Sequence, residues 1–216
     1  MISCENIFFY YPEFKLHIPQ LVIKEGSYTI LAGPSGSGKS TLLQLIAGIL
    51  VPSSGRVLHA DIDLTRLSEE ERCDFRILKL GLVLQEFALL EYLTVVDNIL
   101  LTYRISGMHS MNKEAIEQAH QLLKWVGLEN KQKRFPSQLS QGERQRVAIC
   151  RALVSRPDVL LFDEPTSNLD KKNRDGILSV LEQYRQVKPH TLVVVTHDDE
   201  MYYRADQIIN LDRFQS

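Results

Sequence analysis

The segment that decides the fold is Gly33-Pro34-Ser35-Gly36-Ser37-Gly38-Lys39-Ser40, followed directly by Thr41. It satisfies the phosphate-loop pattern G-x-x-x-x-G-K-[ST]. An apolar run at residues 28–32 precedes it and a helical pattern begins at Thr41, which is the context the pattern requires. Glycines let successive backbone N–H groups curl around phosphate oxygens, and the N-terminus of the helix adds partial positive charge. A glycine-rich turn that only connects two elements is the alternative interpretation.

Two side chains of this loop predict a phosphorylated ligand with a metal ion. Lys39 can reach the β- and γ-phosphates of a nucleotide, and the Ser40 hydroxyl can hold Mg²⁺. We therefore expect residues 33–41 to form a site for a magnesium-bound nucleoside triphosphate.

Two consecutive carboxylates, Asp163 and Glu164, follow an apolar run at residues 159–162. The carboxyl end of a strand is where an α/β sheet presents its ligands, and consecutive strand residues point to opposite sides. We expect Asp163 to face the metal through water. Glu164 is then placed to act as general base on the water that attacks the γ-phosphate. An ordinary acidic turn before Pro165 is the alternative.

The remaining pattern predicts an α/β fold with a mostly parallel core sheet. Apolar, strand-like runs at residues 28–32, 159–162 and 191–195 alternate with helical patterns, which is typical of strands buried on both faces. Residues 7–10 and 14–18 flank a turn and predict a small antiparallel β subdomain at the N-terminus.

A helical subdomain is expected to be inserted into this sheet. Residues 86–140 have a helical pattern, and within residues 114–126 one face carries apolar side chains. These are Ile116, Ala119, Leu122, Leu123 and Val126.

Length and composition indicate a single domain. The chain has 216 residues, 44% of them hydrophobic, and a net charge of −2, which is close to the average for soluble globular proteins. We expect an ATP-binding core from residues 1–85 and 153–216, with residues 86–152 as the helical subdomain.

Because the net charge is only −2, no nucleic acid partner is expected. The apolar stretch 80–101 is interrupted by polar residues and reads as buried protein. Since the N-terminus lacks the pattern of a signal peptide, a cytoplasmic location is expected.

A second motif, Leu139-Ser140-Gln141-Gly142-Glu143, begins a helix that should end before Pro157. Ser140 and Glu143 fit a capping box, which explains both residues without any function. The motif's place between the phosphate loop and the Asp163-Glu164 pair supports a functional interpretation as well. There it resembles the signature motif of ABC ATPases, for which Leu-Ser-Gly-Gly-Gln/Glu would be expected.

On these motifs the chain resembles, over almost its whole length, the ATP-binding subunits of ABC transporters. The resemblance implies a P-loop NTPase fold, ATP and Mg²⁺ as ligands, and ATP hydrolysis. It assigns Gln85 to the Q-loop, as a metal ligand and sensor of the γ-phosphate, and His197 to the switch histidine. Residues 163–170 resemble the Walker B strand end running into the D-loop. Tyr11 matches the aromatic residue that stacks on adenine, with Tyr10 as the fallback and a core tyrosine as the alternative.

The resemblance also implies a head-to-tail homodimer that forms on ATP binding. Each ATP would lie between the phosphate loop of one subunit and residues 140–143 of the other, with Ser140 and Gly142 on the γ-phosphate. Gln141 and Glu143 belong to the same expected contact. Gln141 stands where many relatives have glycine, and it would be strained if that position needed a positive φ.

An integral-membrane permease is the implied partner, with this chain peripheral on the inner face of the cytoplasmic membrane. The amino-acid sequences of these motifs are most similar to those of the bacterial lipoprotein-release, macrolide-export and cell-division group. Residues 87–93 are expected either to grip the permease or to pack in the core. The alternative function is a non-transport ABC ATPase that acts as a scaffold or regulator in cell division, DNA repair or translation.

Overall fold

The computed structural model describes residues 1–12, 14–84, 87–105, 112–166, 169, 171–187 and 190–214. Its centre is a five-stranded parallel sheet of order β6-β7-β8-β3-β9. The strands are β3 (Tyr28–Ala32), β6 (Leu80–Val83), β7 (Val159–Asp163), β8 (Thr191–Val195) and β9 (Gln207–Asn210). The predicted parallel sheet and its three predicted strands are confirmed.

A four-stranded antiparallel sheet of order β2-β1-β4-β5 carries the N-terminus. Its strands are β1 (Ile2–Tyr11), β2 (Phe14–Ile23), β4 (Ser54–His59) and β5 (Ile62–Asp63). The predicted hairpin is confirmed, but both of its strands are longer than expected. Buried residues alternate with more exposed ones in two runs of β1, Ile2 and Cys4 and then Ile7 and Phe9, and Asn6, with a φ of 48°, shifts the alternation between them.

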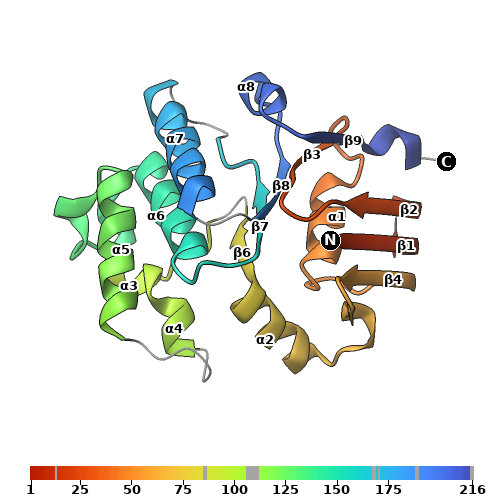
Figure 1. Ribbon diagram of the computed structural model, residues 1–216, viewed down its shortest axis with the longest axis horizontal. Helices are drawn as coiled ribbons and strands as arrows, with labels where there is room; N and C mark the ends of the chain where they lie inside the picture. The colour runs from red at the N-terminus through yellow and green to blue at the C-terminus, as the bar shows by residue number, and fades with distance from the viewer. Residues whose placement is uncertain are drawn as a thin grey trace.

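Helix α1 (Lys39–Ile46) lies between the two sheets (Figure 1). Its apolar side chains Leu42, Leu43 and Ile46 are buried in one cluster with side chains from both sheets. Burial on this scale fixes the start of α1 against the strand ends. The N-terminus of the helix therefore has a defined place at the edge of the parallel sheet.

Among the described residues, four α-helices lie between β6 and β7 and gather at the end of the molecule opposite the antiparallel sheet (Figure 1). They are α3 (Val95–Ile99), α4 (Leu101–Ile105), α5 (Lys113–Trp125) and α6 (Gln141–Leu153). One hydrophobic cluster joins them to a face of the parallel sheet, so the inserted helices share their core with the sheet. The division at residues 85 and 152 stays a prediction.

One position on the predicted apolar face of α5 is wrong. Ala119, Leu122 and Leu123 are buried as expected, but Ile116 is 39% exposed and Ala115 takes the inward place. Spacing admits both positions, because residue 115 lies four residues before 119 and residue 116 lies three before it; the orientation of the helix turns Ala115 inward and Ile116 toward solvent.

The other elements connect these layers. They are α2 (Glu69–Lys79), α7 (Lys171–Val187) and α8 (Asp199–Tyr203), with the 3₁₀ helices η1 (Leu64–Arg66), η2 (Glu129–Lys131), η3 (Pro136–Gln138) and η4 (Leu211–Phe214). Within the described ranges, none of the helices combines the length and the apolar character needed to cross a bilayer.

Candidate active site

The phosphate loop joins β3 to α1, and two of its positions, 33 and 38, have a backbone that only glycine fits. Gly33 has a φ of 146° and Gly38, the N-cap of α1, a φ of 91°. A Cβ on Gly33 would lie 2.6 Å from Ser37 Oγ, and one on Gly38 would lie 2.6 Å from Phe14 Cζ. The two glycines therefore serve both the left-handed turn and the close approach of neighbouring groups.

Lys39 is enclosed by its own loop. Its Nζ donates hydrogen bonds to the carbonyl oxygens of Gly33 and Pro34, both at 2.8 Å, and the residue is only 7% exposed. An ammonium group has three donors, so the third remains for an anion in front of the loop. The loop thus places a positive charge at the N-terminus of α1, where an anionic group is favoured.

Asp163 ends β7 beside Ser40 of α1. Burial raises the pKa of this carboxyl, while a hydrogen bond from the Ser40 side chain and the charge of Lys39 partly lower it. Hydroxyl and carboxylate oxygens are the ligands that Mg²⁺ prefers, so the donor set of Ser40 and Asp163 fits this ion.

Glu164 has a strained backbone and a different partner. Its φ is 51°, which is unusual for a residue other than glycine, and its N–H donates to the Val195 carbonyl at 2.8 Å. Its Oε1 lies 3.5 Å from Nε2 of His197. Burial raises the pKa of Glu164, His197 lowers it, and Asp163 raises it. The two carboxylates therefore point to different partners, Ser40 and His197.

These groups share one cleft of about 850 Å³ at the carboxyl ends of β3, β7 and β8. The lining residues are Ser35, Gly36, Lys39, Ser40, Asp163, Glu164, Thr166, Leu169, Arg174, Val195, Thr196, His197, Asp198, Asp199 and Glu200. The structure thus brings together a lysine, a hydroxyl, two carboxylates and an imidazole from segments far apart in the sequence. That arrangement suits metal-assisted transfer of a phosphoryl group to water.

Two of the polar residues at or beside this site that sequence reasoning did not assign are Gln145 and Arg174. Gln145 of α6 donates from Nε2 to the carbonyl oxygens of Pro165 and, at 3.4 Å, of Glu164. Arg174 of α7 lies in the cleft wall and pairs with Glu200, with 3.0 Å between Nη2 and Oε1. Gln145 lies two residues after the motif at residues 139–143 and Arg174 lies four residues after residue 170, and only the folded arrangement assigns either residue to this site.

The Ser140 segment lies outside the lining of this cleft. Ser140 caps α6 as predicted: the Glu143 N–H donates to Ser140 Oγ at 3.3 Å, and the Ser140 N–H donates to Glu143 Oε2 at 3.1 Å. Burial raises the pKa of Glu143, but hydrogen bonds from Lys131 and the Ser140 backbone outweigh it and hold that pKa below its usual value.

Gln141 meets no left-handed strain, because it is the first residue of α6 and is not among the positive-φ residues of the described chain. Close packing explains why position 142 is glycine. A Cβ there would lie 3.0 Å from Leu169 Cδ2, so even alanine would press on that side chain.

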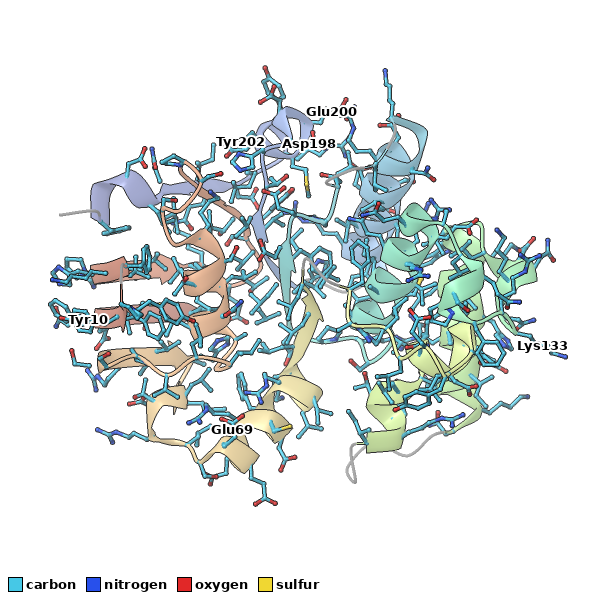
Figure 2. All side chains as sticks on the ribbon, turned by 180° about the vertical axis from the view of Figure 1, so that it is seen from behind. Tyr10, Glu69, Lys133, Asp198, Glu200 and Tyr202 are labelled. Carbon is cyan, nitrogen blue, oxygen red and sulfur yellow. The ribbon has the colours of Figure 1, made fainter. Side chains whose placement is uncertain are left out.

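Tyr11 and Tyr10 lie on opposite faces of β1. Tyr11 shares a face with Phe9, their ring centroids lie 4.9 Å apart, and Phe9 belongs to the cluster that contains α1. Tyr11 also pairs across the hairpin with Phe14, the residue next to Gly38. Tyr10 lies at the outer end of the sheet (Figure 2). At 48% exposure Tyr11 is not a core residue, and its face is the one toward the phosphate loop.

Gln85 and part of the expected D-loop lie outside the described residues. β6 ends at Val83, and Gln85 lies outside the described residues. Of the expected D-loop, residues 167, 168 and 170 also lie outside them.

Comparison with known proteins gives concordant matches. A family model described as ABC transporter matches residues 16–167. The macrolide export ATP-binding/permease protein MacB of Rhodopirellula baltica is 43% identical over 191 residues, which are 88% of this chain and 28% of that protein. The lipoprotein-releasing system ATP-binding protein LolD of Legionella pneumophila is 40% identical over 191 residues, 88% of this chain and 83% of that protein.

Two solved structures of one bacterial ABC transporter cassette, MJ0796, also match. The first, a dimeric structure, aligns with a TM-score of 0.88 and 35% identity, covering 97% of this chain and 94% of the cassette. The second, a dimeric post-hydrolysis state bound to ADP and Pi, aligns with a TM-score of 0.88 and 34% identity. Since these alignments cover nearly the whole chain, they include both sheets and the cleft.

Proposed function

This chain belongs to the ABC transporter family and is the ATP-hydrolysing subunit of such a transporter. We propose that it drives a separate membrane permease by ATP-dependent closure of a homodimer. The observation that carries the proposal is the convergence of Lys39, Glu164 and His197 on one cleft. A phosphate loop alone would support only nucleotide binding. The added carboxylate and imidazole supply groups for chemistry.

ATP would bind with its phosphates over the N-terminus of α1, where Lys39 contributes the third hydrogen of its ammonium group. Glu164 would accept a proton from the attacking water as the new bond from oxygen to the γ-phosphorus forms and the bond to ADP breaks. His197 would keep the Glu164 carboxylate in place through the contact at 3.5 Å. Ionised Glu164 is required for this step.

Ser40 and Asp163 would hold Mg²⁺, with Gln85 expected in the same shell. The bound ion would neutralise phosphate charge during transfer. The chain's own contribution is the pre-arranged pair of oxygen donors, because the Ser40 side chain already reaches Asp163.

The Ser140 segment would act on the ATP of a second copy. Ser140 and Gln141 are exposed at the N-terminus of α6 and do not line the cleft of their own chain. A helix N-terminus of this kind favours an anion, so a partner subunit's phosphates are a suitable ligand. The dimeric cassette structures support the same assembly.

The permease would dock in an apolar groove beside the start of the helical insertion. This groove of about 300 Å³ is lined by side chains that include Leu82, Phe87 and Ile105. Arg151 of α6 shapes its wall by donating to the carbonyl oxygens of Phe87 at 2.5 Å and Ala88 at 2.6 Å. Leu89 instead packs against the core. Within residues 87–93, Phe87 is therefore available to a partner, whereas Leu89 belongs to the packing of the core.

The kind of permease is proposed from the relatives. LolD is named for lipoprotein release and MacB for macrolide export, which favours a permease of the lipoprotein-release and macrolide-export group as the partner. In that assembly this chain would lie on the inner face of the cytoplasmic membrane.

Capture from gently solubilised native membranes tests the proposal. The Glu164→Gln protein, loaded with ATP, is expected to retain a permease of this group. The matched control is Ile105→Glu in the same background, which places a charge in the groove while leaving the cleft intact and should lose the permease. Recovery of soluble or nucleic acid partners alone would refute the transport function while leaving ATP hydrolysis in place.

A further inference from the structure

The first turn of α7 is tied to the segment that carries His197. Arg174 Nη2 lies 3.0 Å from Glu200 Oε1, and Arg174 Nε lies 3.7 Å from Asp198 Oδ2. Figure 2 shows Asp198 and Glu200 on the side of α8 that faces α7. The side chain of Asp198 is only 9% exposed, so this cluster is shielded from water more than a surface pair.

Asp198 is the neighbour of His197 in the chain, and its hydrogen bonds hold the turn on which both residues lie. Its N–H donates to Thr196 Oγ1 at 3.1 Å, and its carboxylate accepts from the Glu200 N–H at 3.0 Å. These bonds fix the turn on which His197 stands. The His197 side chain is itself 60% exposed, so packing does not hold it and the turn beneath it decides its position.

The same turn of α7 also touches α6, the helix that begins with the Ser140 segment. Arg146 donates to Asn173 Oδ1, and Leu169, two residues before the start of α7, lies against Gly142. Residues 173 and 174 therefore hold two neighbours at once, α6 on one side and the His197 turn on the other.

We propose that Arg174 is a positioning residue for ATP hydrolysis, which holds His197 against Glu164 through Asp198 and Glu200. The inference rests on the proposed function and names a residue that no sequence motif marks. Arg174 lines the cleft, but its guanidinium pairs with the carboxylates of Asp175, Asp198 and Glu200. Two of these belong to the His197 turn, so the charge serves that turn and not the phosphates.

Steady-state ATP hydrolysis by Arg174→Met, Arg174→Lys and Arg185→Met tests this assignment. Arg185 is the matched control, because it lies on the same helix and pairs with Asp206 at 3.1 Å outside the cleft. A small displacement of a catalytic group is costly, so Arg174→Met should lower kcat roughly tenfold or more with KM for ATP changed less than about twofold. Arg174→Lys, which keeps the charge, should recover part of the rate, and Arg185→Met should match wild type.

A double-mutant cycle distinguishes positioning of His197 through Glu200 from a purely structural role of Arg174. If Arg174 acts through Glu200, then Glu200→Gln should lower kcat far less in the Arg174→Met background than in wild type. Additive losses, a wild-type kcat for Arg174→Met, or a loss confined to ATP binding would overturn the inference. Absence of turnover by the wild-type protein would instead overturn the proposed function, which keeps the two failures distinct.

Discussion

Nε2 of His197 lies 3.5 Å from Oε1 of Glu164 across the carboxyl ends of two adjacent parallel strands, β7 and β8. Burial raises the pKa of Glu164 and the imidazole partly lowers it again. The pair thus sets both the position and the protonation state of the proposed base. Its consequences are open to direct measurement.

The pH profile of ATP hydrolysis should report this pair. A general base must be ionised, so kcat should be lost as pH falls through the pKa of Glu164, at higher pH than for an ordinary glutamate. His197→Ala removes a group that lowers this pKa, and the acid limb of kcat should therefore move to higher pH. His17→Ala is the control, because His17 stacks on Phe8 in the antiparallel sheet. An unmoved limb in His197→Ala would argue against the contact.

Two capping boxes separate a local role of Ser140 from its role in the dimer. Ser140 caps α6 and Ser68 caps α2 with the same pattern of bonds. Each serine-to-alanine change should lower the free energy of unfolding by about 1 kcal/mol, measured by urea denaturation. Only Ser140→Ala should also weaken ATP-dependent dimerisation. Equal dimerisation by both variants would leave Ser140 with the capping role alone.

Adenine stacking should depend on Tyr11 and not on Tyr10. Tyr11 lies on the face of β1 toward the phosphate loop, and Tyr10 lies on the other face with a similar exposure of 52%. Loss of a stacked ring should raise the Kd for ATP roughly tenfold, as for aromatic stacking on bases. Titration calorimetry on Tyr11→Ala and Tyr10→Ala distinguishes the two, and the reverse order of effects would assign the stacking to Tyr10.

Two glycines should respond to alanine with opposite signs. A Cβ on Gly81 of β6 would collide with the Ala152 carbonyl oxygen and lie 2.6 Å from Leu160 Cδ2. Gly81→Ala should therefore cost at least about 1–3 kcal/mol of unfolding free energy. A Cβ on Gly176, inside α7, meets nothing within 4 Å, so Gly176→Ala should stabilise by up to about 1 kcal/mol. Thermal or urea denaturation checks both, and a stable Gly81→Ala would contradict the packing of β6 against α6.

The sequence predicted the parallel sheet well because its central strands are apolar on both faces. β3 and β8 are buried along their whole length, so their runs stand out from the chain. The strands β4 and β9 were not predicted, since their residues mix polar and apolar types. On α5, Ile116 was placed inward because its type is apolar, and only the helix orientation shows that Ala115 takes that place.

The site was predictable where a local motif carries it. The phosphate loop and the Asp163-Glu164 pair are contiguous patterns, and the structure brings both into one cleft. The contact of Glu164 with His197 depends on strand order, and the Arg174 cluster depends on how α7 packs beside α8. Those relationships arise from tertiary packing and have no counterpart in residue spacing.

The state of the Glu164→Gln protein in ATP tests the central claim most directly. By sedimentation velocity with Mg²⁺ and ATP, this variant should bind nucleotide, fail to hydrolyse it and accumulate as a dimer, while Lys39→Ala with the same change stays monomeric. That result would place ATP between two subunits and Glu164 at the chemical step. A Glu164→Gln protein that binds ATP yet remains a monomer at high concentration, or that hydrolyses ATP at the wild-type rate, would contradict the account.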